Sequence, residues 1–196
     1  MIYRKIIKRI LDLILAIIAL PFVLIICLIF GILIYIEDKG DIFYIAKRRG
    51  LNGSIFGMYK LRSMKMNAPD IRNKDNSTFN SANDPRVTKI GKILRKTSID
   101  ELPQVFNILK GDISIVGPRP IVEKETQIYG DDVEKLLSVK PGLTGYWQAY
   151  ARNNATYESG ERQKMEMYYV EHNSLWLDIK ILFKTVISVI KKEGAQ

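Results

Sequence analysis

The strongest pattern along the chain is a long run of apolar residues near its start. Residues 13–36 read LILAIIALPFVLIICLIFGILIYI and contain no charged side chain. A run of this length can cross or deeply enter the hydrocarbon core of a bilayer, which is about 30 Å thick. Because the run is too long for a signal peptide and lacks a small-residue cleavage site at its end, we expect it to be retained.

Basic residues flank this run on both sides. Those before it are Arg4, Lys5, Lys8 and Arg9, and those soon after it are Lys39, Lys47, Arg48 and Arg49. A single spanning helix would leave one basic group on the wrong side of the membrane, whereas a segment that enters and returns would keep both in the cytoplasm. Pro21 provides a possible break, although proline also occurs in helices that span. We therefore predict a re-entrant membrane helix within residues 1–38 and keep a spanning helix as the alternative.

The next segment has the pattern of a β-hairpin. Residues 41–64 read DIFYIAKRRGLNGSIFGMYKLRSM, and Asn-Gly between two apolar runs is a strong hairpin signal. Lys60 and Arg62 are two residues apart on the second strand, so they share a face, which is either a solvated face or an anion site. Residues 67–86 are polar and lack a period, which predicts a surface loop or lid.

Two short helices are predicted around a pair of acidic residues. The first covers residues 88–96, and the second covers residues 102–110 and ends at Gly111, as helices often end at glycine. Residues 112–120, DISIVGPRP, then predict a short strand that runs into a rigid turn. Arg119 lies between two prolines whose φ angles are fixed, so we expect a positioned guanidinium rather than a mobile one.

The last periodic segment, residues 175–192, is apolar over most of its circumference. A narrow polar stripe runs along it, formed by Lys180, Lys184, Ser188 and Lys191 or Lys192. This pattern predicts a helix that lies at a membrane surface or packs against the membrane segment, with an ordinary core helix as the alternative.

Composition narrows the chemistry. A chain of 196 residues supports one domain, and its net charge of +9 points to an anionic partner: nucleic acid, a lipid surface or a phosphorylated small molecule. We expect no nucleic acid, because the basic residues are dispersed among apolar segments. With Cys27 and His172 as the only residues of their kinds, disulfide frameworks, thiolate metal sites and histidine triads are excluded. Catalysis would have to use carboxylates, lysine, arginine, hydroxyls or a metal held by oxygen.

The acidic pair, Asp100 and Glu101, lies in RKTSIDELPQVF. Ser98 to Glu101 matches a capping box, but with Ser98 as N-cap Pro103 would have to donate the first intrahelical hydrogen bond, which proline cannot do. If Asp100 is the N-cap, Pro103 falls at the third helical position, where its missing donor costs nothing. Both carboxylates would then lie at the positive end of the helix dipole.

An ionised aspartate beside a second carboxylate has several possible roles. It could bind Mg²⁺, attack phosphorus as a nucleophile, or do both in turn. Phosphoryl transfer also needs cations, and the available ones are Lys60, Arg62, Arg95 and Arg119. From the residues alone, chemistry and helix capping remain equal alternatives.

The chain resembles the small monotopic phosphoglycosyltransferases of the bacterial sugar transferases. The motifs that carry the resemblance are KRILD, YKLRSM, LRKTSIDELPQVFNILKGDISIVGPRP and KPGLTGYWQ. They extend over nearly the whole chain, and the block at residues 94–120 is very specific. One departure is that the family's membrane helix usually breaks at a Ser-Pro pair, whereas Pro21 follows Leu20 and comes about one turn earlier.

This resemblance implies transfer of a sugar 1-phosphate from a UDP-sugar to polyprenyl (undecaprenyl) phosphate, with Mg²⁺ and release of UMP. The reaction would be the first membrane step of polysaccharide or glycoconjugate synthesis, at the cytoplasmic face of the bacterial inner membrane. Asp100 corresponds to the nucleophile that forms a phosphosugar-aspartate, and Glu101 to a partner carboxylate that helps to hold the metal. Lys60, Arg95 and Arg119 match basic positions of the family's active site, and Arg62 and Arg152 match less decisively.

The expected architecture is therefore an α+β, membrane-embedded (monotopic) enzyme. Residues 39–174 would form a cytoplasmic catalytic domain, and residues 175–196 a C-terminal amphipathic helix at the interface. The sugar stays open between galactose, glucose and an acetamido sugar, and a homodimer is possible. The rival function is a membrane-tethered anion-binding module without turnover, in which Asp100 and Glu101 only cap a helix.

Overall fold

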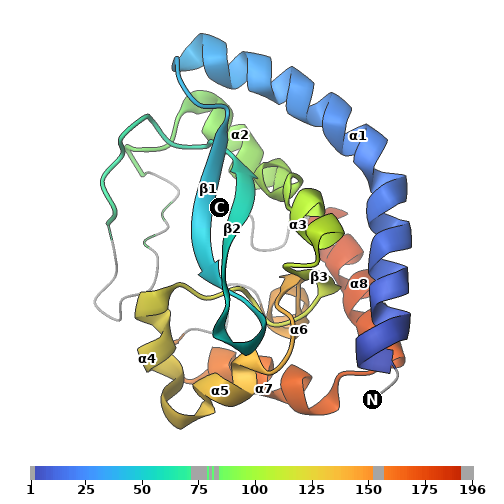
Figure 1. The fold of residues 1–196 in the computed structure, drawn as a ribbon. Coiled ribbons are helices and arrows are strands. Elements are labelled where there is room, and N and C mark those ends of the chain that lie inside the picture. Colours follow the sequence, from blue (N-terminus) through green and yellow to red (C-terminus); the bar gives the residue numbers. More distant parts are fainter. Residues whose placement is uncertain (1–2, 72–78, 80, 82–83, 152–156, 191–196) are drawn as a thin grey trace.

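The computed structural model describes residues 3–71, 79, 81, 84–151 and 157–190. Helices and short strands are mixed, as predicted, and one long helix runs along the outside of the domain (Figure 1). After a π-helical turn at Tyr3–Ile7, the helices and strands are α1 (Lys8–Glu37), β1 (Phe43–Arg49), β2 (Ile55–Leu61), α2 (Lys89–Thr97), α3 (Gln104–Lys110), β3 (Ser114–Val116), α4 (Thr126–Tyr129), α5 (Val133–Leu137), β4 (Gly142–Thr144), α6 (Tyr146–Tyr150), α7 (Glu161–His172) and α8 (Leu175–Ile190).

Helix α1 contains the predicted apolar run and is long and apolar enough to cross a membrane. Its 30 residues correspond to about 45 Å at 1.5 Å per residue. Pro21 lies inside the helix and does not end it. Large apolar side chains such as Ile18, Phe22 and Leu28 are exposed along α1, which is unusual for a protein surrounded by water.

The opposite side of α1 belongs to the main hydrophobic core. The buried side chains of this core come from α1, β2, α2, α3 and the residue before β3; they are Ala16, Val23, Cys27, Ile34, Leu61, Leu94, Val105, Ile108 and Ile113. The α1 members are spread over most of the helix. The helix therefore packs on one domain along much of its length.

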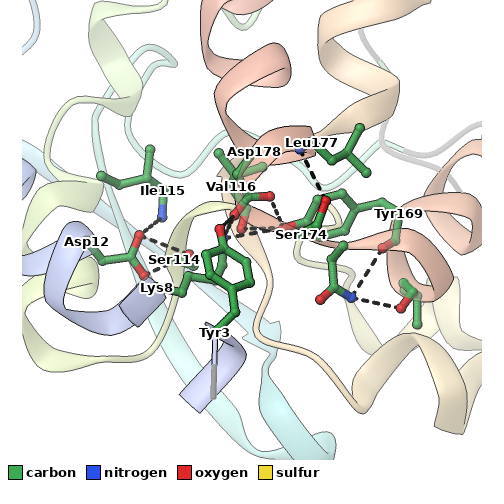
Figure 2. Close-up of polar contacts among 12 residues, drawn as sticks. Tyr3, Lys8, Asp12, Ser114, Ile115, Val116, Tyr169, Ser174, Leu177 and Asp178 are labelled. Carbon is green, nitrogen blue, oxygen red and sulfur yellow. Dashed lines mark hydrogen bonds and ion pairs between the residues drawn. The ribbon is translucent and has the colours of Figure 1, made fainter. Parts of the chain in front are cut away.

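Polar contacts hold the N-terminal end of α1 to this domain (Figure 2). Asp12 is buried and accepts hydrogen bonds from Ser114 Oγ at 2.8 Å and from the backbone N–H of Ile115 at 2.9 Å. Lys8 forms an ion pair with Asp178 of α8. These contacts tie the start of α1 to β3 and α8.

The C-terminal end of α1 is held to the same domain. The Glu37 carboxylate accepts from the backbone N–H groups of Lys89 and Ile90, at 2.6 and 2.8 Å, and so caps the N-terminus of α2. Asp38 follows directly and accepts a hydrogen bond of 2.8 Å from Arg62 Nη1.

The predicted hairpin is confirmed. Strands β1 and β2 pair antiparallel from Phe43 opposite Leu61 to Arg49 opposite Ile55, and Asn52 in the turn has a left-handed backbone with φ of 54°. Asn107 of α3 fixes the hairpin: its side chain accepts from Tyr59 N–H at 2.9 Å and donates to the carbonyl of Gly57 at 2.8 Å. Strand β2 is thus held against α3.

The predicted strand after α3 is β3, and it pairs in parallel with β4, which the sequence pattern did not reveal. At Gly142, the first residue of β4, the two segments come so close that an added Cβ would lie 2.0 Å from the backbone nitrogen of Gly117. Only glycine allows this approach. This close approach occurs at Gly117, just before Pro118, and it supports the start of the Pro-Arg-Pro turn.

The predicted C-terminal helix is confirmed as α8. Ile181 of α8 packs in a second core with Val116, Ala149 and Tyr169. The expected polar stripe is partly wrong: Lys180 and Lys184 are exposed, but Ser188 is buried. Apolar side chains are exposed instead at Trp176, Ile179, Phe183 and Val186.

The prediction of a surface loop at residues 67–86 is wrong at its end. Asp84 and Arg86 are buried and form an ion pair of 2.6 Å, and Arg86 Nη1 donates to the carbonyl of Pro69 at 2.7 Å. Hydrogen bonds from Arg86 lower the pKa of Asp84 to about 2. Much of the middle of the predicted loop lies outside the described residues.

Candidate active site

The acidic pair lies on a separate 3-10 turn between α2 and α3. Ser98 ends α2 with a left-handed backbone (φ of 57°), residues Ile99–Glu101 form the turn, and α3 begins at Gln104 with Pro103 in the N-cap position. The prediction that Asp100 caps the second helix is therefore wrong. The left-handed Ser98 starts an extra turn, and Pro103 then takes the cap position, where it needs no N–H.

Lys60 approaches both carboxylates from strand β2. Its Nζ lies 2.7 Å from Glu101 Oε1 and 3.8 Å from Asp100 Oδ2. Asp100 and Glu101 lie on the turn between α2 and α3, and strand β2, which carries Lys60, is hydrogen-bonded to α3. These connections bring Lys60 to the acidic pair. The ammonium offsets the repulsion between two neighbouring carboxylates.

Asp100 is 8% exposed. Burial raises its pKa to about 6; Lys60 and Arg95 oppose this shift, and Glu101 adds to it. At neutral pH the carboxylate is therefore mostly ionised but poorly solvated. Such a group is suited to nucleophilic attack, because less water has to be removed before it reacts.

Arg95 extends from the last turn of α2, and its Nε donates to Ser63 Oγ at 3.0 Å. Burial lowers the pKa of Arg95, whereas the carboxylates of Asp100 and Asp84 raise it. The guanidinium thus lies in the electrostatic field of Asp100 and is held by a neighbouring hydroxyl.

Arg119 contributes a second guanidinium from the Pro-Arg-Pro turn. Burial alone would lower its pKa, but the carboxylates of Glu101, Glu125 and Glu166 help to raise it overall. Its backbone N–H also donates to Glu166, at 3.2 Å from Oε2. The structure therefore brings together Lys60, Arg95 and Arg119 around Asp100 and Glu101.

The other two candidate arginines are not part of this group. Arg62 is buried with Asp38, and it donates to both the carboxylate and the backbone carbonyl of that residue. The structure thus gives Arg62 a role in fixing the end of α1. Arg152 lies outside the described residues, so its part in substrate binding stays a prediction.

The carboxylate oxygens of Asp100 and Glu101 could take part in binding Mg²⁺. Within the described residues no group of three or more His, Cys, Asp or Glu side chains could hold a metal ion. Mg²⁺, however, is commonly bound by one or two carboxylates together with waters and substrate phosphates. Asp100 and Glu101 fit that pattern if a diphosphate completes the site.

Three site residues were missed from the sequence: Ser63, Glu125 and Glu166. Ser63 could have been identified as a site residue, because it is next to the candidate residue Arg62 near the end of the predicted hairpin. Glu166 had none, since a glutamate in a polar helix is ordinarily exposed, and only the packing of α7 buries it.

The chain matches the family described as bacterial sugar transferase over residues 3–192. It is 45% identical over 170 residues to an undecaprenyl-phosphate galactose phosphotransferase of Salmonella typhimurium, with 81% of this chain and 35% of the relative covered. It is 38% identical to the exopolysaccharide production protein ExoY of Rhizobium meliloti, with 96% and 87% covered. It is 36% identical to a UDP-N-acetylgalactosamine-undecaprenyl-phosphate N-acetylgalactosaminephosphotransferase of Aeromonas hydrophila, with 97% and 45% covered.

The chain spans less than half the length of two of these curated relatives, whereas it spans most of ExoY. The family match includes the acidic pair, the three cations around it and the long apolar helix. The chain belongs to the bacterial sugar transferase family.

Proposed function

We propose that the protein transfers a sugar 1-phosphate from a UDP-sugar to polyprenyl phosphate, most simply undecaprenyl phosphate, with release of UMP. The observation that carries the proposal is the buried Asp100 carboxylate beside Glu101: Lys60 contacts both carboxylates, Arg95 lies in the field of Asp100, and Arg119 lies in the field of Glu101. Three cations beside an acidic pair suit a donor diphosphate and an acceptor phosphate, which are both anionic. The names of the relatives support the same two substrates.

The first step of the proposed reaction forms a covalent intermediate. An Asp100 carboxylate oxygen attacks the phosphorus that bears the sugar, the bond from this phosphorus to the bridging oxygen breaks, and UMP leaves with that oxygen. In the second step a phosphate oxygen of the polyprenyl phosphate attacks the same phosphorus and expels the Asp100 carboxylate. The product is a polyprenyl diphosphosugar, and one nucleophile serves both substrates in turn.

The cations have separate tasks in this scheme. Lys60 lowers the pKa of Asp100 and so favours its ionised form, and Arg95 and Arg119 neutralise charge on the transferring phosphoryl group and the leaving UMP. Mg²⁺, if bound by Asp100, Glu101 and the donor diphosphate, would add charge neutralisation at the phosphates.

We further propose that the protein is monotopic and acts at the cytoplasmic face of the bacterial inner membrane. Both ends of α1 make polar contacts with the same domain, at Asp12 and at Glu37, and buried side chains lie along the helix between them. A straight spanning helix would have to give up one set of contacts. The exposed apolar side chains of α1 and α8 support a shared membrane surface.

The test uses the purified chain in detergent with Mg²⁺ and no lipid acceptor. Each of UDP-galactose, UDP-glucose, UDP-N-acetylgalactosamine and UDP-N-acetylglucosamine is supplied in turn. With the correct donor we expect about one equivalent of UMP per enzyme and a phosphosugar on Asp100 by mass spectrometry. Adding undecaprenyl phosphate should make UMP release catalytic.

The matched control is a pair of asparagine variants. Asp100→Asn should give neither UMP nor the adduct, whereas Asp41→Asn, at an exposed position, should give both. If no donor yields UMP or an adduct, the chain is instead an anion-binding module. If Asp100→Asn turns over normally, another group is the nucleophile.

A further inference from the structure

Glu166 is a fully buried carboxylate outside the acidic pair. It lies on α7, and 0% of it is exposed. Burying an ionisable group is costly unless it is hydrogen-bonded or paired, so a buried glutamate needs a specific compensation. Both of its carboxylate oxygens accept from the backbone N–H of Arg119, at 3.3 and 3.2 Å.

This hydrogen bond is made at a special point of the chain. Proline has no backbone N–H, so in Pro118–Arg119–Pro120 the only backbone donor belongs to Arg119. That donor is the one that Glu166 binds. The prolines restrict the φ angles of the turn, and Glu166 fixes the turn in space relative to α7.

Two cationic side chains oppose the effect of burial on Glu166. Arg162 lies one turn earlier on α7, and its guanidinium lies 3.9 Å from the ring centroid of Trp147 and 3.8 Å from that of Tyr157. Two of its nitrogens, Nε and Nη2, are buried without a hydrogen-bond partner in the described part of the chain. Burial raises the pKa of Glu166 to about 7, while Arg162 and Arg119 oppose this shift. Glu166 thus lies in the field of two guanidinium groups, one of which is held by aromatic rings.

We propose that Glu166 is a positioning residue, which holds the Arg119 guanidinium in the candidate active site by binding the backbone N–H of Arg119. Glu166 does not touch the substrate. Its effect is carried by the Pro-Arg-Pro turn, whose guanidinium lies in the field of Glu101. The inference rests on the proposed function, because Arg119 matters only if a phosphoryl group is transferred beside it.

The test is a double-mutant cycle on the rate at which the full chain forms the covalent adduct from its UDP-sugar donor. Glu166→Leu, which removes both acceptor oxygens, and Arg119→Ala are each expected to slow this rate about 10- to 100-fold, because small displacements of positioning groups cost that much. If Glu166 acts through Arg119, the double variant should be no slower than Arg119→Ala alone. Rates are normalised to the folded fraction, measured by thermal unfolding.

Two further variants separate positioning from stability. Glu166→Gln keeps one acceptor oxygen without the charge, and it should recover part of the rate that Glu166→Leu loses. Glu171→Gln removes a carboxylate from the same helix, where it is exposed and pairs with Lys135 at 2.5 Å, and it should leave the rate unchanged.

The possible failures are distinguishable. If the unmodified chain releases no UMP from any donor, the proposed function fails. If the unmodified chain is active but the effects of Glu166→Leu and Arg119→Ala multiply in the double variant, Glu166 acts independently of Arg119 and the inference is overturned. A normal rate in Glu166→Leu would overturn it as well.

Discussion

Lys60 Nζ is shared unequally between two adjacent carboxylates, at 2.7 Å from Glu101 and 3.8 Å from Asp100. The short contact engages Glu101, so Asp100 receives the field of the ammonium without being tied up in a close ion pair. A carboxylate in that situation is ionised and still available to attack phosphorus. This geometry fits the different tasks proposed for two residues that look equivalent in the sequence.

The first prediction follows from this contact. Replacing Lys60 with methionine removes the cation that lowers the pKa of Asp100, so a smaller fraction of Asp100 is ionised at neutral pH. Adduct formation should slow about 100-fold, and its pH profile should move to higher pH. Lys110→Met, which removes an exposed ammonium, is the control. An unchanged pH profile in Lys60→Met would show that Lys60 does not tune Asp100.

A second prediction concerns the pH dependence of stability at Glu166. Its folded-state pKa of about 7 lies above that of an unfolded glutamate, so the folded chain keeps a proton that the unfolded chain loses. The stability of the unmodified chain should therefore fall as pH rises from about 4.3 to 7, by roughly 4 kcal/mol at most. Glu166→Gln should lack this contribution. Urea unfolding at pH 5 and pH 8 measures it, and parallel changes in the two proteins would contradict the prediction.

The third prediction concerns the buried contact between Asp12 and β3. Asp12→Ala leaves the Ser114 hydroxyl and the Ile115 N–H without this acceptor, which should destabilise the fold by about 1 to 3 kcal/mol. The change in the urea midpoint measures the loss. Asp41→Ala, at an exposed position, should have little effect. Equal midpoints for the two variants would mean that Asp12 is not an anchor.

A fourth prediction tests the topology of α1. In a Cys27→Ala background, single cysteines at exposed positions, Ile7→Cys and Lys39→Cys, mark the two ends of the helix. In inverted inner-membrane vesicles, whose cytoplasmic side faces the solution, a membrane-impermeant maleimide should label both cysteines. In intact cells whose outer membrane has been made permeable, the same reagent should label neither. Labelling of the two ends from opposite sides would establish a spanning helix.

Local signals were sufficient for several parts of the fold. Asn52 and Gly53 indicated the hairpin turn because both adopt positive φ there, and Gly111 ended α3 for the same reason. The apolar run and the periodicity of residues 175–192 identified α1 and α8. Each of these signals depends on neighbouring residues in the chain.

Other features depend on contacts between distant segments and left no local trace. The left-handed Ser98 moved the start of α3 to Gln104, although the capping pattern and Pro103 were read from the sequence. The burial of Asp84 and Arg86 accompanies a hydrogen bond from Arg86 to the carbonyl of Pro69, 17 residues away, in a stretch whose composition is that of a loop. Three cations of the site were named from resemblance, but their convergence required the packing of β2, α2 and the Pro-Arg-Pro turn.

Helix α3 connects the start of α1 to the acidic pair. At its C-terminal end, Arg9 of α1 donates to the carbonyl of Leu109 at 2.9 Å, and its N-terminal end follows the turn that carries Asp100. Seven residues of helix are about 10 Å long. Under the proposed function, these two turns of helix would set the distance between the start of the membrane segment and the proposed nucleophile, and so the place that an acceptor phosphate has to reach.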